Sequence, residues 1–314
     1  MLYKRPKLVA LVGPTASGKS VLAIKLAKKF NGEIISADSR QIYEGMDIGT
    51  AKSYRTKNEK RKMKNNILII EGIPHYMIDV VKPDKEFTLT HFKKETLKII
   101  KDIQKRGKIP FLVGGTGLYV RAVTDNLEIP KVPPDKKLRK KLEKEIEQGT
   151  KKSYHKLLKL DPAAKKFIDP QNPRRIIRAL EVCLKSEKSF SQLRKKGEEF
   201  FDVLEIGIKL PKEKLHKKIN QRVDKMIKQG LIKETKELSQ KYSWDLPSMS
   251  GIGYKQIGMY LRGEIDLKEA IELIKRDTRR YAKRQITWFK RDKRIKWITN
   301  YKEAKKIIKE FLIS

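Results

Sequence analysis

The chain has 314 residues, of which 39% are hydrophobic, and a formal net charge of +37 from 75 Lys and Arg against 38 Asp and Glu. Such a chain can bury a core, which excludes wholesale disorder, and its basic excess predicts a nucleic-acid partner unless a lysine-rich proteome or a hot habitat explains the charge. The single cysteine, Cys183, excludes an internal disulfide and a cysteine-rich zinc module. No apolar run approaches the ~18 residues of a membrane helix, so we expect a cytoplasmic protein without a membrane partner.

Short apolar runs and amphipathic segments alternate along the first part of the chain. The pattern predicts strands at residues 7–12, 33–36, 67–70 and 109–113, with helices at 20–30 and 92–103. Strands that alternate with helices in this way indicate an α/β domain built on a parallel sheet.

The character of the sequence changes from about residue 133. The stretch up to residue 200 is basic and helix-periodic, with no clear strand, and a strand pattern resumes at 202–210. The sequence therefore predicts an α/β core formed by residues 1–125 and 201–314, with a helical insertion domain at 126–200.

The last part of the chain is mostly helical in pattern. Apolar residues at regular spacing from Leu215 to Leu231 predict one long amphipathic helix. A second long helix is predicted after Asp266, followed by a short strand at 296–299 and a terminal helix.

A glycine-rich loop follows the first predicted strand. It reads GPTASGKS and matches the phosphate-binding pattern G-x-x-x-x-G-K-[ST], in the required place between a strand and a helix. The glycines let backbone N–H groups turn toward phosphate oxygens, and the helix N-terminus adds a positive dipole end. Lys19 can reach the terminal phosphate, and the Ser20 hydroxyl can ligate Mg²⁺. We therefore expect a P-loop core of the nucleoside-triphosphate-hydrolase type, with a phosphate site formed by Gly13, Pro14, Thr15, Ala16, Ser17, Gly18, Lys19 and Ser20.

The carboxylates near this loop argue against a hydrolytic motor. Such enzymes place an Asp at the end of an apolar strand to hold Mg²⁺ and water, but the run at 109–113 ends in Gly114, and we interpret Asp79 as structural. Asp38 follows the predicted strand at 33–36, at the edge where ligands bind in open α/β sheets. We expect it to act as a general base or to orient a substrate. The alternative is a loop aspartate that caps a turn.

Two basic clusters are candidates for RNA contacts. The segment RDTRRYAKRQITWFKR, as a helix, places Arg276, Arg280, Lys283 and Arg284 along one side and leaves Ile274, Tyr281, Ile286 and Phe289 available to the core. The insertion contributes Arg174, Arg175 and Arg178. Basic residues interleaved with aromatic ones suit a surface that follows a phosphate backbone. The alternative is an ordinary amphipathic helix with a solvated basic face.

Seven segments spread over nearly the whole chain resemble the tRNA dimethylallyltransferase family, also called the tRNA isopentenyltransferases. In order they read GPTASGKS, DSRQIYEGMDIGTAK, PHYMIDV, FLVGGTGLY, LDPAAKKFIDPQNPRRIIRALEV, SGIGYKQ and RYAKRQITWFKR. The second is far more specific than a phosphate loop, and few unrelated proteins would carry it together with GGTGLY.

The resemblance implies an activity. An enzyme of this family transfers a dimethylallyl group from dimethylallyl diphosphate to the N6 amino group of the adenosine immediately 3′ of the anticodon, position 37 of tRNA. The products are N6-dimethylallyladenosine and diphosphate. The implied partners are dimethylallyl diphosphate and the tRNA anticodon stem-loop, the implied cofactor is Mg²⁺ held by Ser20, and no obligate protein partner is expected, so that the enzyme would be a monomer.

The resemblance also implies roles for individual residues. Asp38, Thr116 and Arg222 would be catalytic: Asp38 takes the proton, Thr116 sits beside the reacting groups, and Arg222 acts with Lys19 on the leaving diphosphate. The implied tRNA contacts are Asp38, Ser39, Arg40, Gln41, Thr116, Arg139, Arg174, Arg175, Ile176, Ile177, Arg178, Arg280 and Arg284.

Two other functions are compatible with parts of the sequence. A small-molecule kinase of the P-loop class would place ATP in the loop, but it would leave the two basic clusters unexplained. A non-enzymatic RNA-binding protein would have no use for an intact phosphate loop. Both alternatives predict no transfer of a prenyl group to tRNA.

Overall fold

The computed structural model describes residues 5–52, 61–64, 67–186 and 188–314. They form two compact units, one that comprises the chain up to Thr124 and from Phe200 onward, and one from Asp125 to Glu199. No helix among the described residues is long and apolar enough to cross a membrane.

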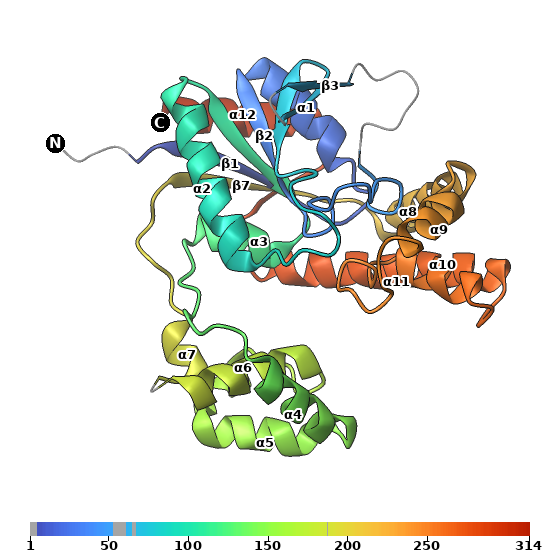
Figure 1. The fold of residues 1–314 in the computed structure, drawn as a ribbon. Coiled ribbons are helices and arrows are strands. Elements are labelled where there is room, and N and C mark those ends of the chain that lie inside the picture. Colours follow the sequence, from blue (N-terminus) through green and yellow to red (C-terminus); the bar gives the residue numbers. More distant parts are fainter. Residues whose placement is uncertain (1–4, 53–60, 65–66, 187) are drawn as a thin grey trace. The chain divides into compact units, whose positions relative to one another are not determined.

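The first unit contains all the named strands and most of the helices (Figure 1). Its elements are β1 (Lys7–Val12), α1 (Lys19–Lys29), β2 (Gly32–Ala37), β3 (Arg61–Lys64), β4 (Ile67–Ile70), β5 (Ile73–Tyr76), α2 (Leu89–Lys105), β6 (Ile109–Gly114), α3 (Gly117–Thr124), β7 (Asp202–Ile208), α8 (Lys212–Lys228), α9 (Leu231–Ser239), α10 (Tyr254–Leu261), α11 (Leu267–Lys290), β8 (Lys296–Ile298) and α12 (Tyr301–Ile313).

The strands form one sheet in the order β3-β4-β5-β2-β6-β1-β7-β8. From β5 to β8 all neighbours are parallel, which confirms the predicted α/β core. The predicted strand at 67–70 exists as β4, but it pairs antiparallel with β5. The cause is the two-residue turn between them, where Glu71 (φ 49°) and Gly72 (φ 81°) both adopt the left-handed conformation of a tight hairpin.

The register of the central strands decides where the site lies. Gly114 at the end of β6 pairs with Val12 at the end of β1 and with Ala37 at the end of β2. The loops that follow these three strands therefore leave the sheet side by side, at its carboxyl edge. An open α/β sheet binds ligands at this edge.

Helices cover both faces of the sheet because strand side chains alternate between them. Val9 and Leu11 of β1 face a core that includes residues of α1 and α12, whereas Leu8 and Ala10 face a core with residues of α2, α3 and α11. Side chains of α8 to α11 pack on the segment that follows β2 in a third core, which includes Ile42, Met46, Val223, Leu231 and Tyr254.

The prediction of one long helix from Leu215 to Leu231 is wrong. The helix α8 ends at Lys228, and Leu231 is the first residue of α9. Gly230 between them has a φ of 99°, a left-handed conformation that ends a helix and that glycine adopts without strain. The break directs α9 onto the segment after β2, which Leu231 helps to bury.

The second unit is a small helical bundle with its own core. It contains α4 (Lys136–Glu147), α5 (Thr150–Leu160), the 3₁₀ helix η1 (Pro162–Lys166), α6 (Pro173–Lys185) and α7 (Phe190–Leu193). Leu142, Leu157, Ile176 and Leu180 are almost fully buried in that core. The buried carboxylate of Glu181 on α6 lies beside it and is fully enclosed.

Candidate active site at the carboxyl edge of the sheet

The loop after β1 has the backbone conformation of an anion site. Gly13, Ala16 and Gly18 have positive φ angles of 149°, 61° and 92°, and α1 begins at Lys19 directly after Gly18. The first N–H groups of a helix have no partner within it, so here they are available to an anion. The Ser17 hydroxyl is buried and also has no hydrogen-bond partner among the described residues.

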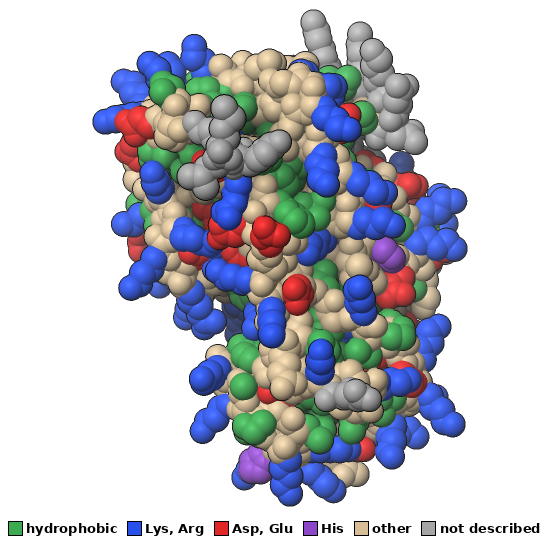
Figure 2. Space-filling view, turned by 90° about the vertical axis from the view of Figure 1, so that its left-hand side faces the viewer, with side chains coloured by type: hydrophobic (Ala, Val, Ile, Leu, Met, Phe, Trp, Pro, Cys, Tyr) green, Lys and Arg blue, Asp and Glu red, His purple; other side chains and the backbone are tan. Residues whose placement is uncertain are grey.

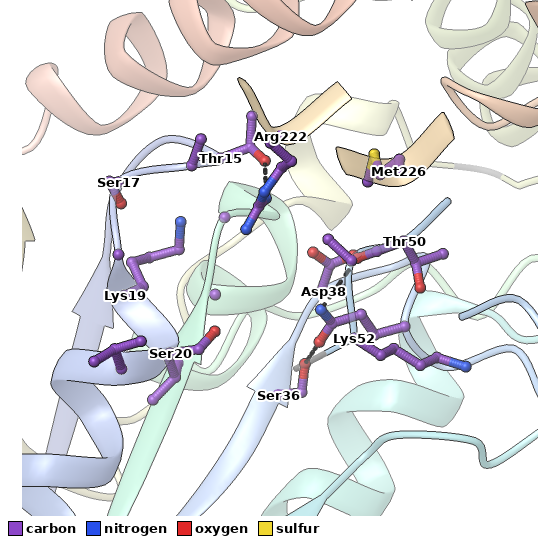
Figure 3. Close-up of a pocket in the computed structure, with 18 of the residues that line it drawn as sticks. Thr15, Ser17, Lys19, Ser20, Ser36, Asp38, Thr50, Lys52, Arg222 and Met226 are labelled. Carbon is purple, nitrogen blue, oxygen red and sulfur yellow. Dashed lines mark hydrogen bonds between the residues drawn. The ribbon is translucent and has the colours of Figure 1, made fainter. Parts of the chain in front are cut away.

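Two partly buried cations, Lys19 and Arg222, lie at this loop (Figure 3). Lys19 Nζ donates to the carbonyl oxygen of Pro14 at 2.6 Å, and Arg222 Nη1 donates to Thr15 Oγ1 at 3.0 Å. Within the described residues neither cation forms a salt bridge with a carboxylate. Burial, with a smaller contribution from Arg222, lowers the pKa of Lys19 to about 7, and burial also lowers the pKa of Arg222. A bound anion would relieve both effects.

Asp38 lies on the other side of the same cavity. It follows β2, is partly buried, and accepts the Arg40 N–H with Oδ1 at 2.9 Å. Asp38 therefore does cap a turn, as the alternative predicts, but it uses only one carboxylate oxygen to do so. Both roles can be true together, because the residue also lines the cavity that contains Lys19 and Arg222.

Two cavities meet at this point. The first, of about 350 Å³, is lined by the phosphate loop from Thr15 to Ser20. The second, of about 380 Å³, is lined by residues of α8, α10 and α11, the loop before α10 and the segment after β2. Both are lined by Asp38 and Arg222, so these two residues stand where the cavities join. The other residues that line both are Thr15, Thr50, Ala51, Met226 and Tyr281.

The turn after β2 is held in place by a network of hydrogen bonds. Thr116 Oγ1 accepts the Ser39 N–H at 3.1 Å, Arg40 Nη1 donates to the carbonyl oxygen of Pro247 at 2.6 Å, and the Ser36 hydroxyl donates to Gln41 at 3.1 Å. Thr116 does not line either cavity, so its visible role is to hold the turn that carries Asp38.

The predicted RNA contacts on α11 are exposed, but Tyr281 of this helix does not lie where the sequence predicts. Arg280 and Arg284 are at the surface, and Arg284 lies over the Tyr281 ring at 5.8 Å. Tyr281, expected in the core, instead lines both cavities. Burial raises the pKa of its hydroxyl to about 12, so this group stays protonated.

The predicted contacts in the second unit fall into three groups. Arg174 and Arg175 are exposed at the start of α6. Arg139 and Arg178 instead bind Glu181, at 2.8 and 2.5 Å. The side chains of Ile176 and Ile177 are buried in the core of the bundle. Ile176 and Ile177 thus contribute to the core of the bundle, and the tRNA contacts expected at these two positions stay a prediction.

Lysine and arginine side chains are spread over the visible surface and are not gathered over one element (Figure 2). The net charge alone therefore does not mark a binding face.

Two buried polar residues of the site were missed in the sequence. Gln285 of α11 contacts both the phosphate loop and the turn after β6. Glu234 of α9 accepts the N–H groups of Ile48 and Gly49 and the Tyr254 hydroxyl, which fixes the segment that lines the first cavity. Neither residue stands in a pattern that distinguishes it from the other Gln and Glu residues of amphipathic helices.

Comparison with known proteins identifies the family of this chain. Residues 41–292 match the IPP transferase family model. The chain is 46% identical over 312 residues to the tRNA dimethylallyltransferase of Carboxydothermus hydrogenoformans, covering 98% of this chain and 96% of that one. It is 47% identical over 298 residues to the enzyme of that name from Clostridioides difficile, covering 94% and 92%.

Solved structures agree. The full-length tRNA isopentenylpyrophosphate transferase of Bacillus halodurans matches with a TM-score of 0.70 at 38% identity, over 98% of this chain and 96% of that one. A eukaryotic dimethylallyltransferase described as acting on tRNA matches with a TM-score of 0.71 at 32% identity, over 90% of this chain and 70% of that one. This chain belongs to the IPP transferase family, the tRNA dimethylallyltransferases.

Proposed function

We propose that this chain transfers a dimethylallyl group from dimethylallyl diphosphate to the N6 amino group of the adenosine at position 37 of tRNA, immediately 3′ of the anticodon. One observation carries the proposal. The cations Lys19 and Arg222 are partly buried at the phosphate loop and have no carboxylate salt bridge within the part of the chain that the structure describes. A carboxylate, Asp38, stands where this cavity meets a second one.

The diphosphate would occupy the first cavity. There the free N–H groups at the start of α1, together with Lys19 and Arg222, would bind the anion. The loop would thus hold a diphosphate without hydrolysis of a nucleotide. As the bond from the allylic carbon to oxygen breaks, negative charge grows on the leaving diphosphate. Fixed donors aimed at that charge lower the barrier more than they tighten ground-state binding.

The acceptor adenine would enter the second cavity. To reach it, the base has to leave its stack in the anticodon loop. Its amino nitrogen attacks the allylic carbon, the carbon–nitrogen bond forms, and one proton has to leave that nitrogen. Asp38 lies at the junction of the cavities and can accept the proton. An aromatic amine is a poor nucleophile, so a carboxylate that accepts its N–H bond helps by keeping electron density on nitrogen.

A magnesium ion fits this donor set only together with the substrate. Among the described residues no group of three or more His, Cys, Asp or Glu could hold a metal. Mg²⁺ needs no such group, because it keeps several waters and binds substrate phosphates with one or two protein oxygens. The exposed Ser20 hydroxyl in the first turn of α1 is such an oxygen. A bound Mg²⁺ would neutralise charge on the diphosphate.

The exposed arginines supply the proposed tRNA contacts. Arg280 and Arg284 lie on α11, and Arg284 also lines the second cavity. Arg174 and Arg175 lie on α6 of the helical unit. We propose that this unit, from Asp125 to Glu199, grips the tRNA and takes no part in binding the prenyl group, and that the enzyme acts as a monomer.

Incubation with labelled dimethylallyl diphosphate, Mg²⁺ and unmodified tRNA tests the proposal. We expect label on a single adenosine at position 37 and release of diphosphate, with no need for ATP. Consumption of ATP without transfer of label to tRNA would identify a P-loop kinase instead. RNA binding without either reaction would identify a non-enzymatic RNA-binding protein.

A further inference from the structure

Gln285 is a buried side chain of α11 whose amide joins two loops of the site. Its Oε1 accepts the N–H of Thr15 at 2.8 Å, and its Nε2 donates to the carbonyl oxygen of Gly115 at 2.9 Å. The side chain is 6% exposed. One amide group thus satisfies two backbone groups that lie far apart in the sequence.

The two loops belong to different halves of the reaction site. Thr15 is part of the phosphate loop, and its hydroxyl accepts the hydrogen bond from Arg222. Gly115 precedes Thr116, whose hydroxyl holds Ser39 next to Asp38. The amide of Gln285 therefore connects the group that holds the diphosphate to the turn that carries the proposed base.

The fit around this amide is tight. A Cβ atom at Gly115 would lie 2.2 Å from Gln285 Nε2, and a Cβ atom at Gly117 would lie 2.2 Å from the Trp288 ring. The glycines of this turn thus let α11 pack directly on it. A buried backbone group without a hydrogen-bond partner destabilises the folded state. Without the amide, the two loops would therefore have to move to find new partners.

We propose that Gln285 is a positioning residue that sets the spacing between the leaving diphosphate and the acceptor amine. The inference rests on the proposed function. Transfer requires the allylic carbon, the amine and Asp38 to be aligned, and a shift of about 1 Å can slow such a reaction about a hundredfold. Gln285 lines the first cavity, but both polar atoms of its amide are bonded to backbone groups, so that it acts through Thr15 and Gly115.

The test compares Gln285→Met with Gln104→Met in the full chain. Methionine has nearly the same size as glutamine but removes the hydrogen bonds. The control amide, Gln104, donates to the carbonyl oxygen of Lys7, at the opposite end of β1 from the phosphate loop. Single-turnover transfer at saturating tRNA and dimethylallyl diphosphate gives a rate constant and an amplitude, and thermal unfolding gives the stability.

We expect Gln285→Met to lower the rate constant at least about tenfold, with tRNA affinity unchanged. A merely structural role would lower the amplitude or the unfolding temperature, as in the control, and leave the rate constant of the folded fraction native. A native rate constant in Gln285→Met overturns the inference.

A second variant approaches the same hydrogen bond from the other side. Gly115→Ala places a methyl group against the amide, and we expect a fall in the rate constant of this variant as well. A native rate constant in Gly115→Ala would contradict the inference. If the wild-type chain bound no inorganic pyrophosphate and transferred no prenyl group, the proposed function itself would fail, and the inference with it.

Discussion

Two clusters of partly buried cations are treated in opposite ways. In the helical unit, Arg139 and Arg178 both bind the fully enclosed carboxylate of Glu181. In the sheet unit, Lys19 and Arg222 share a cavity and donate to neutral oxygens. A charge that is withdrawn from water without a counter-charge is costly, and proteins keep one where a ligand supplies the counter-charge. A salt bridge to a buried carboxylate thus distinguishes the two arginines that stabilise the fold, Arg139 and Arg178, from Arg222, which we assign to a ligand.

The largest effect is expected at the paired cluster. Glu181→Ala leaves Arg139 and Arg178 without their carboxylate, and loss of one partner of a buried pair destabilises by about 3–5 kcal/mol, of which we expect the lower end because both arginines are partly exposed. Denaturant unfolding should show the loss, and Glu145→Ala is the control, since Glu145 forms a long surface pair with Lys156 at 3.5 Å. Equal stability in both variants would mean that the Glu181 cluster does not hold the bundle.

Asp38→Asn should have the next largest effect, on chemistry alone. The amide preserves the shape and the acceptor for the Arg40 N–H but cannot take a proton. General-base help contributes about 10²–10⁴ in rate, so single-turnover transfer should slow at least about a hundredfold. Affinity for tRNA and for the prenyl diphosphate should stay near native. Native transfer would show that water or another group is the base and that Asp38 only anchors its turn.

Local patterns in the sequence predict the ligand site well, but not the cluster around Glu181. The phosphate loop and Asp38 are readable because a short motif and a strand end determine their position. The pairing of Arg178 with Glu181 was not read as structural, since a basic helix face looks the same whether its arginines bind a buried carboxylate or an RNA. The hydrogen bond from Arg222 to Thr15 joins residues 207 positions apart, and only the family resemblance placed Arg222 at the leaving diphosphate. Gly230, by contrast, was a readable helix end that was overlooked.

A smaller effect is expected where arginines are exposed. Removing Arg174 and Arg175 together should weaken tRNA binding and make the slope of log affinity against log salt less steep, by about 0.7–0.9 for each phosphate that is no longer neutralised. Lys151→Ala with Lys152→Ala on α5 removes the same charge from exposed positions and is the matched control. If both pairs change the slope equally, net charge and not a particular face determines tRNA affinity.

A further prediction concerns the pH dependence of stability at another paired carboxylate, Glu33. Burial alone would raise the pKa of Glu33, but hydrogen bonds from Arg106, Lys108 and Tyr76 outweigh it and lower the pKa to about 2, from an ordinary 4.5. The stabilisation is therefore complete above pH 4.5 and is lost as pH falls from there toward 2. Acid unfolding of Glu33→Gln should be less steep in this window than that of the wild-type chain. Identical pH dependence would mean that other groups govern acid stability.

The contrast between the two clusters is tested most directly by measuring Arg222→Ala and Arg178→Ala in the same two assays, calorimetric binding of inorganic pyrophosphate and denaturant unfolding. Arg222→Ala should bind pyrophosphate at least about tenfold more weakly, because a hydrogen bond to a charged group contributes about 1.5–3 kcal/mol, while its unfolding free energy stays the same or rises. Arg178→Ala should show the reverse, with native pyrophosphate affinity and lower stability. An Arg222→Ala variant that lost stability and kept its affinity for pyrophosphate would contradict the assignment of Arg222 to the ligand.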